Sequence, residues 1–114
     1  MATALFDGAS VGWAELGAAC PVVPGATVSK PLLNGLVKVV LFAMDAGQEI
    51  SEHRAPYVAT VHVLDGRLAF GVGGQEWQMV AGSWLVMPPN EPHRLRAEEP
   101  TRFVLTMVKE SGKA

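Results

Sequence analysis

Three histidines are the residues of this chain best suited to chemistry at neutral pH. His53, His62 and His93 each carry an imidazole ring that can hold a metal, move a proton or bind a ligand by a hydrogen bond. His53 and His93 each follow a turn, and we expect each to lie at or near the start of a strand, where two rings can converge at a barrel mouth. The plain alternative is a pair of half-buried rings satisfied by backbone or water.

Other catalytic signatures are missing from the sequence. It contains no HExxH, CxxC or P-loop motif, no nucleophile elbow and no Gly-rich dinucleotide fingerprint. Zinc proteases of the HExxH type, serine hydrolases and nucleotide-binding folds are therefore disfavoured. The histidines remain the candidates for any site.

The elements that must position them are short strands. Twelve glycines and eight prolines divide the chain into segments rich in Val, Leu and aromatic residues, which predicts an all-β sandwich or barrel. Hairpin turns are expected at Asp65-Gly66 and Gly73-Gly74. Residues 1–25 form an N-terminal extension that is irregular or an edge strand, with a helical turn or an edge strand over 13–19, and residues 26–110 form the barrel. The expected strands are 26–33, 36–44, 57–64, 67–72, 75–80, 83–87, 93–97 and 101–109.

Strand alternation predicts which way the histidines point. Arg94 and Arg96 share one face of their strand, and arginines rarely point unpaired into a core, so His93 is expected to face inward. In the strand that contains His62, the alternate residues form a wholly apolar face. His62 is therefore expected on the outer side.

Composition excludes several classes of partner. The 114 residues are 49% hydrophobic and 18% charged, with a net charge of −2. No basic stripe supports a nucleic-acid partner, and no apolar run approaches the ~20 residues of a membrane helix. The start of the chain does not resemble a signal peptide, and the single Cys20 cannot form an internal disulfide. We expect a cytoplasmic protein that binds neither nucleic acid nor membrane.

Two segments of the chain resemble the motifs of the cupin family, in its small single-domain bacterial form. The first motif, G-x5-H-x-H-x3,4-E-x6-G, and the second, G-x5-P-x-G-x2-H-x3-N, lie in register, separated by residues 67–81. The matching residues are Gly47, His53 and Gly66 in the first motif and Gly82, Pro88 and His93 in the second. The resemblance covers residues 26–108 and implies a single cupin barrel, a jelly roll also called a double-stranded β-helix.

The sequence departs from the family at the metal-binding positions. Ala55 stands at the second histidine, Ala59 (or Thr60, with the longer gap) at the glutamate, and Ala97 at the final asparagine. What the resemblance implies is then an incomplete metal site made of His53 and His93. His62 is a less favoured third ligand because it faces outward. One divalent transition metal (Fe, Mn, Ni, Zn or Cu) is a possible cofactor, and none is certain.

Several functions stay open at this point. The first is a binding module that holds a small organic ligand in the barrel mouth near His53 and His93, with Tyr57, Met44 and Met87 beside it. The alternative is a metal-dependent cupin enzyme: a dioxygenase, isomerase or decarboxylase. A metal-free isomerase or epimerase with a histidine base and a protein that only dimerises are further readings. We expect a homodimer from the resemblance, and because the edge strand over 26–33 needs cover.

Overall fold

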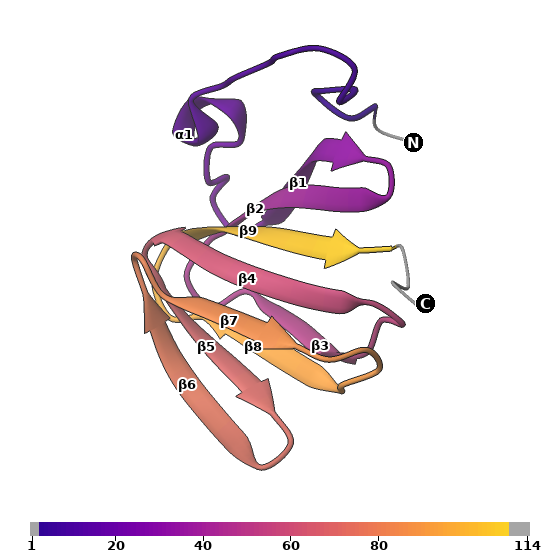
Figure 1. Ribbon diagram of the computed structural model, residues 1–114. Coiled ribbons are helices and arrows are strands. Elements are labelled where there is room, and N and C mark those ends of the chain that lie inside the picture. The colour runs from indigo at the N-terminus through magenta and orange to yellow at the C-terminus, as the bar shows by residue number, and fades with distance from the viewer. Residues whose placement is uncertain (1–2, 110–114) are drawn as a thin grey trace.

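The computed structural model describes residues 3–109, which form two antiparallel sheets and one helical turn (Figure 1). The elements are α1 (Leu16–Ala19), β1 (Thr27–Asn34), β2 (Val37–Met44), β3 (Glu49–His53), β4 (Val58–Asp65), β5 (Arg67–Val72), β6 (Gln75–Val80), β7 (Trp84–Met87), β8 (His93–Ala97) and β9 (Thr101–Val108). One sheet has the order β1-β2-β9-β4-β7 and the other the order β3-β8-β5-β6. The predicted all-β jelly roll is confirmed.

Every strand predicted from the sequence is present, with ends that agree within one residue. The expected end of the barrel, residue 110, lies outside the described residues. One strand, β3, was not predicted, because Ile50 is the only apolar residue in it and its neighbours are exposed. The expectation that His53 lies at or near the start of its strand was wrong, since His53 ends β3.

The turn at Asp65-Gly66 was also predicted wrongly as a hairpin. β4 and β5 flank it but lie in different sheets, so the chain crosses from one layer to the other. Gly66 has a φ of +89°, and a Cβ there would fall 2.3 Å from the backbone oxygen of Pro100. This close approach to the next turn, which only glycine permits, redirects the chain. The hairpin at Gly73-Gly74 is confirmed, because β5 pairs with β6.

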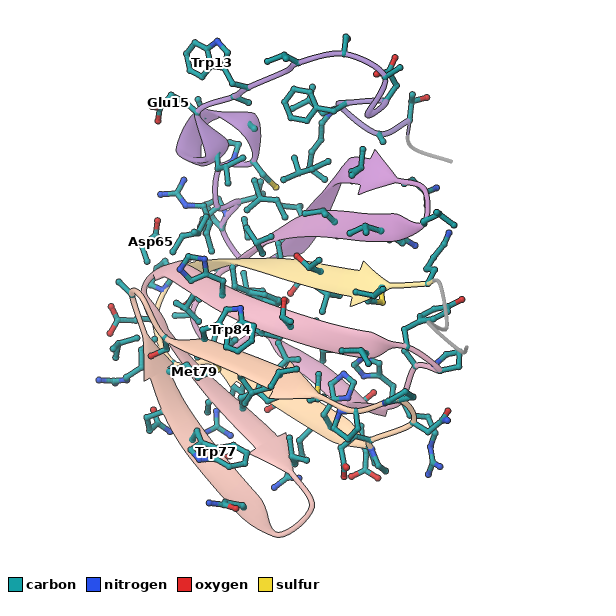
Figure 2. All side chains as sticks on the ribbon, viewed as in Figure 1. Trp13, Glu15, Asp65, Trp77, Met79 and Trp84 are labelled. Carbon is teal, nitrogen blue, oxygen red and sulfur yellow. The ribbon has the colours of Figure 1, made fainter. Side chains whose placement is uncertain are left out.

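The N-terminal extension covers part of the outer face of the five-stranded sheet. The backbone N–H groups of Leu5 and Phe6 donate to the carbonyl oxygens of Pro31 and Leu32 at 2.9 Å each, which ties the extension to β1. Under it lies a small core of Cys20, Leu32, Leu41 and Ala43. Figure 2 shows Trp13 and Glu15 at one end of the molecule, far from Trp77 at the other.

Arg102 joins this extension to the barrel. Its guanidinium donates to the carboxylate of Asp65, with Nη2 2.9 Å from Oδ2, and Nη1 donates to the carbonyl oxygen of Gly17 at 2.9 Å. One side chain of β9 therefore holds both the end of β4 and the helical turn α1. No helix within residues 3–109 has the length and apolar character needed to span a membrane.

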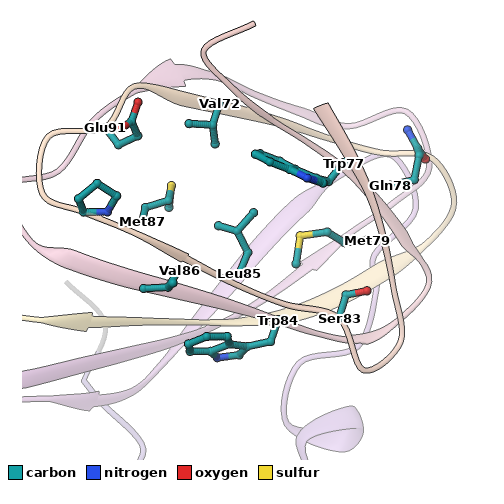
Figure 3. Close-up of a pocket in the computed structure, with 11 residues that line it drawn as sticks. Val72, Trp77, Gln78, Met79, Ser83, Trp84, Leu85, Val86, Met87 and Glu91 are labelled. Atoms are coloured by element: carbon teal, nitrogen blue, oxygen red, sulfur yellow. The ribbon is translucent and has the colours of Figure 1, made fainter. Parts of the chain in front are cut away.

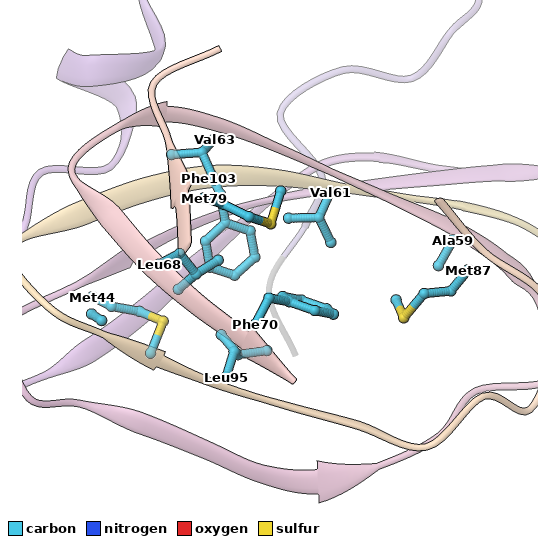
Figure 4. Close-up of a cluster of buried hydrophobic side chains, with 11 residues drawn as sticks. Met44, Ala59, Val61, Val63, Leu68, Phe70, Met79, Met87, Leu95 and Phe103 are labelled. Atoms are coloured by element: carbon cyan, nitrogen blue, oxygen red, sulfur yellow. The ribbon is translucent and has the colours of Figure 1, made fainter. Parts of the chain in front are cut away.

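The main core lies between the two sheets. Alternate residues of β4 point inward and are buried, and the aromatic rings of Phe42 and Phe103 stack across β2 and β9 at 4.9 Å. Figure 4 shows Met44 and Met87 at opposite ends of this cluster. Burial of so many apolar side chains stabilises the barrel, at about 25 cal/mol per Å² removed from water. The buried members are Met44, Ala59, Val61, Val63, Leu68, Phe70, Met79, Met87, Leu95, Ala97 and Phe103.

Candidate functional site

His53 and His93 meet at one end of the four-stranded sheet. They are paired residues of the antiparallel strands β3 and β8, and their ring centroids lie 4.2 Å apart with the planes tilted by 60°. The pairing shifts register between Ile50 and His53, which is the signature of a bulge. Bulges re-aim side chains at barrel rims, and this one lies directly before His53.

Backbone carbonyls fix the orientation of both rings. Nδ1 of His53 lies 2.9 Å from the carbonyl oxygen of Ser51, and Nδ1 of His93 lies 2.9 Å from that of Glu91. A carbonyl oxygen only accepts hydrogen bonds, so Nδ1 must carry the proton in each ring. In the neutral imidazoles the free lone pair is then on Nε2. The pair therefore offers two Nε2 acceptors to a ligand or an ion.

The two rings differ in their surroundings. His93 is 7% exposed and stacks on Phe70, with ring centroids 5.6 Å apart and planes 8° from parallel. Burial lowers the pKa of His93 below its ordinary value, and the hydrogen bond to the Glu91 carbonyl opposes this only in part. His53 is exposed. The site thus has a buried, neutral imidazole behind one that faces solvent.

Two small cavities flank His93. The outer one, of about 10 Å³, brings together Tyr57, Met87 and His93, and it is lined also by Ala55, Ala59, Pro88 and Glu91. The inner one, of about 30 Å³, touches both histidines and is lined otherwise by apolar core residues. A water molecule needs about 10–15 Å³. The outer cavity therefore has room for about one water-sized group such as a hydroxyl and the inner one for about two, and a whole organic molecule has no room in either.

The other predicted site residues lie elsewhere. Met44 is fully buried at the far end of the core and lines neither cavity. His62 is exposed on the outer face of β4, where it pairs with Trp84 and Val104. The expectations that His93 faces inward and His62 outward are both confirmed.

The donor set does not fit a conventional metal centre. Ala55 and Ala59 hold the positions where the motif calls for ligands, and methyl groups coordinate nothing. Within residues 3–109, no group of three or more His, Cys, Asp or Glu side chains is placed to share an ion. Two imidazoles remain, whereas divalent transition metals usually take three or more protein ligands.

The carbonyls of Ser51 and Glu91 were missed by reasoning from the sequence. Each lies two residues before the histidine that it orients. The only signal for them is this shared spacing, because a backbone oxygen is present at every position and carries no residue type. Within residues 3–109 the carboxylate of Glu91 forms no ion pair.

Comparisons with known proteins place this site in a family. The family model of the cupin domain matches residues 40–109, more than half of the chain. A conserved protein of unknown function from Streptococcus pyogenes is 25% identical, with a TM-score of 0.83 over 98% of this chain and 97% of that one. An RmlC-like cupin from Desulfovibrio desulfuricans is 24% identical, with a TM-score of 0.79 over 88% of this chain and 98% of that one.

A cupin 2 conserved-barrel protein from Leptotrichia buccalis is 30% identical, with a TM-score of 0.78 over 82% of this chain and 46% of that one. No curated protein matches the chain. The matched family model and the two-sheet barrel agree with the motifs around His53 and His93. This chain belongs to the cupin family.

Proposed function

We propose that this cupin binds a small organic ligand through a hydrogen-bond donor, such as a hydroxyl group, that it presents to His53 and His93. The observation that carries the proposal is the pair of Nε2 acceptors, created by the two Nδ1–carbonyl hydrogen bonds of 2.9 Å. A neutral imidazole with a free Nε2 accepts a proton-bearing group and offers nothing to another acceptor. The pair therefore favours a hydroxyl or amine over an ionised carboxylate.

The sizes of the cavities shape the proposed ligand. The cavities of about 10 Å³ and 30 Å³ beside His93 hold a head group about the size of one or two water molecules, so the body of the ligand lies outside them. Tyr57 and Pro88 line the outer cavity and present apolar surface to that body. The proposed ligand is then a neutral molecule with an apolar body and one O–H donor.

Phenol and toluene form a matched pair of probes, because they share shape and differ by the donor. NMR spectra of the histidine rings, recorded at pH 7.5, report on each site during the titration. We expect saturable shifts of the His53 and His93 signals with phenol and about tenfold weaker binding of toluene, because toluene has no donor for the two Nε2 acceptors. The exposed His62 ring is the internal control. Equal binding of phenol and toluene would contradict the proposal.

A separate experiment tests the metal-dependent alternative. Metal analysis of untagged protein, after incubation with Fe, Mn, Ni, Zn and Cu, measures bound ion per chain. If the wild type binds nearly one metal ion per chain and His93→Gln binds none, the metal-dependent hypothesis would be favoured over the proposed binding module. Such a result would also require a ligand beyond the two imidazoles.

The homodimer stays a prediction. The outer face of β4 and β7 carries a cluster of exposed apolar side chains, with Val58 at 40%, Trp84 at 61% and Val86 at 53% exposure. Such patches on a sheet face are typical of protein interfaces. Light scattering at micromolar concentration measures the mass directly, and a monomer there would end this expectation.

A further inference from the structure

A further cavity of the described chain is lined by neither of the two histidines. It is a groove of about 530 Å³ where the two sheets come apart, between the edge strands β6 and β7. Figure 3 shows Trp77 and Met79 on one side of it and Leu85 and Met87 on the other. These four are inner-face residues of their strands, whereas Trp84 and Val86, which also line the groove, lie on the outer face of β7.

Trp77 shows most clearly that the core is uncovered here. It pairs with Phe70 across β5 and β6 on the same face of the sheet, and Phe70 is 0% exposed while Trp77 is 39% exposed. Interiors of proteins are close-packed, and one large indole on an inner face is left beside open space. The groove is within the range of about 300–1,000 Å³ that small-molecule sites occupy.

The charge of the groove selects among small molecules. Of the described residues that line it, Glu91 is the only charged one, and Gln78 and Ser83 add neutral polar groups. Within residues 3–109 no ion pair neutralises the Glu91 carboxylate. A site with an aromatic face, apolar walls and one anion is complementary to a cation with an apolar body.

We propose that this groove binds a small organic ammonium ion with an apolar or aromatic body. The Glu91 carboxylate accepts hydrogen bonds from the ammonium group, while Trp77, Met79 and Leu85 cover the body. This site is distinct from the histidine pair, which presents neutral acceptors to a hydroxyl group, and it does not rest on the function proposed there. The two sites adjoin at Met87, Pro88 and Glu91, which line both the groove and the outer cavity.

The test uses 2-phenylethylammonium and its neutral counterpart 2-phenylethanol, which have nearly the same size. Chemical shifts of the Trp77 indole N–H, identified by its absence in Trp77→Leu, follow the titration of the whole chain. We expect the ammonium to bind about tenfold more tightly than the alcohol, from the charge-assisted hydrogen bond and the indole face. Added salt should weaken the ammonium alone.

Three variants separate the contributions. Glu91→Gln keeps the shape and should remove the preference for the ammonium, leaving the alcohol unchanged. Trp77→Leu should weaken both probes. Trp13→Leu is the matched control, since Trp13 is 79% exposed at the opposite end of the molecule (Figure 2), and it should change neither. Circular dichroism confirms that each variant folds.

Three results would overturn the proposal. Equal affinity for the two probes, or an unchanged preference in Glu91→Gln, would mean that the carboxylate does not select a cation. A dimer whose mass falls to that of a monomer in Trp77→Leu would mean that a second copy of the chain covers the groove. Because phenol binding is read at His53 and His93, failure of this proposal is distinguishable from failure of the one above.

Discussion

Replacing His93 by Gln should change how the stability of the protein depends on pH. His93 is 7% exposed, and burial lowers the pKa of its ring below the ordinary 6.5. The nearby His53 ring lowers it further, while the carbonyl and the charge of Glu91 oppose both effects in part. In the unfolded chain the ring is solvated and has its ordinary pKa, so the unfolded state takes up a proton first as the pH falls.

The sign follows from proton linkage. Between pH 6.5 and the lower pKa of the folded state, the unfolded chain binds more protons, so the free energy of unfolding falls as the pH falls. A single proton gives a slope of at most about 1.4 kcal/mol per pH unit. From pH 7.5 to 5.5 the loss due to His93 is therefore at most about 1.4 kcal/mol, reached only when the folded ring stays neutral throughout. Above pH 7.5 His93 contributes no slope.

Urea unfolding at pH 7.5, 6.5 and 5.5 measures this difference. His93→Gln keeps a donor for the Glu91 carbonyl but cannot titrate, so its stability should fall less than that of the wild type. His62→Gln is the matched control, because His62 lies exposed on the outer face of β4, and it should retain the wild-type slope. Carboxylates contribute equally to all three proteins and cancel in the comparison. Parallel curves for wild type and His93→Gln would mean that His93 binds its proton equally well in the folded and unfolded states.

Three further predictions concern the frame around the site. Gly66→Ala should cost at least about 3 kcal/mol in urea unfolding, because its Cβ would meet the Pro100 oxygen at 2.3 Å. Gly82→Ala has a similar φ of +90° with open space around it, so it should cost only about 1 kcal/mol; equal losses would contradict the steric argument. Arg102→Ala should lower the free energy of unfolding by about 1–2 kcal/mol and speed amide exchange in α1. Unchanged exchange would mean that the hydrogen bond from Arg102 to the Gly17 carbonyl does not stabilise α1. Cys20 is 5% exposed and burial raises the pKa of its thiol, so Ellman's reagent should label it in urea and not in the native protein, and rapid native labelling would show an open core.

The sequence predicted most of the barrel because its strands alternate. In β8 the arginines at 94 and 96 are exposed while His93 and Leu95 are buried, which is the pattern that a half-buried strand must show. The same reasoning placed His62 outside. Glycine and proline marked the strand ends, because the turns between strands favour these residues whichever sheet the next strand joins.

Alternation of apolar and polar residues does not identify a strand that has no buried face. It also does not show when a turn connects strands of different sheets. β3 has one half-buried residue, Ile50, and four exposed ones, so its membership in the sheet comes from backbone pairing with β8. The Asp65-Gly66 turn carries the residues of a hairpin, and the contact of Gly66 with Pro100 sends the chain to the other layer. Both depend on distant backbone, which local sequence does not reveal.

Glu91 shows how the candidate site divides between what sequence can and cannot specify. Its main-chain carbonyl oxygen orients His93, a role that any residue at this position could fill once the loop has its shape. Its side chain lines one end of the groove, with Val72 between it and Trp77 (Figure 3), and the role proposed for it there depends on the carboxylate. Glu91→Gln therefore changes the groove and leaves the carbonyl that holds the histidine. A variant that lost phenol binding at His93 together with the ammonium preference would show that the two cavities, joined at Met87 and Pro88, act as one site.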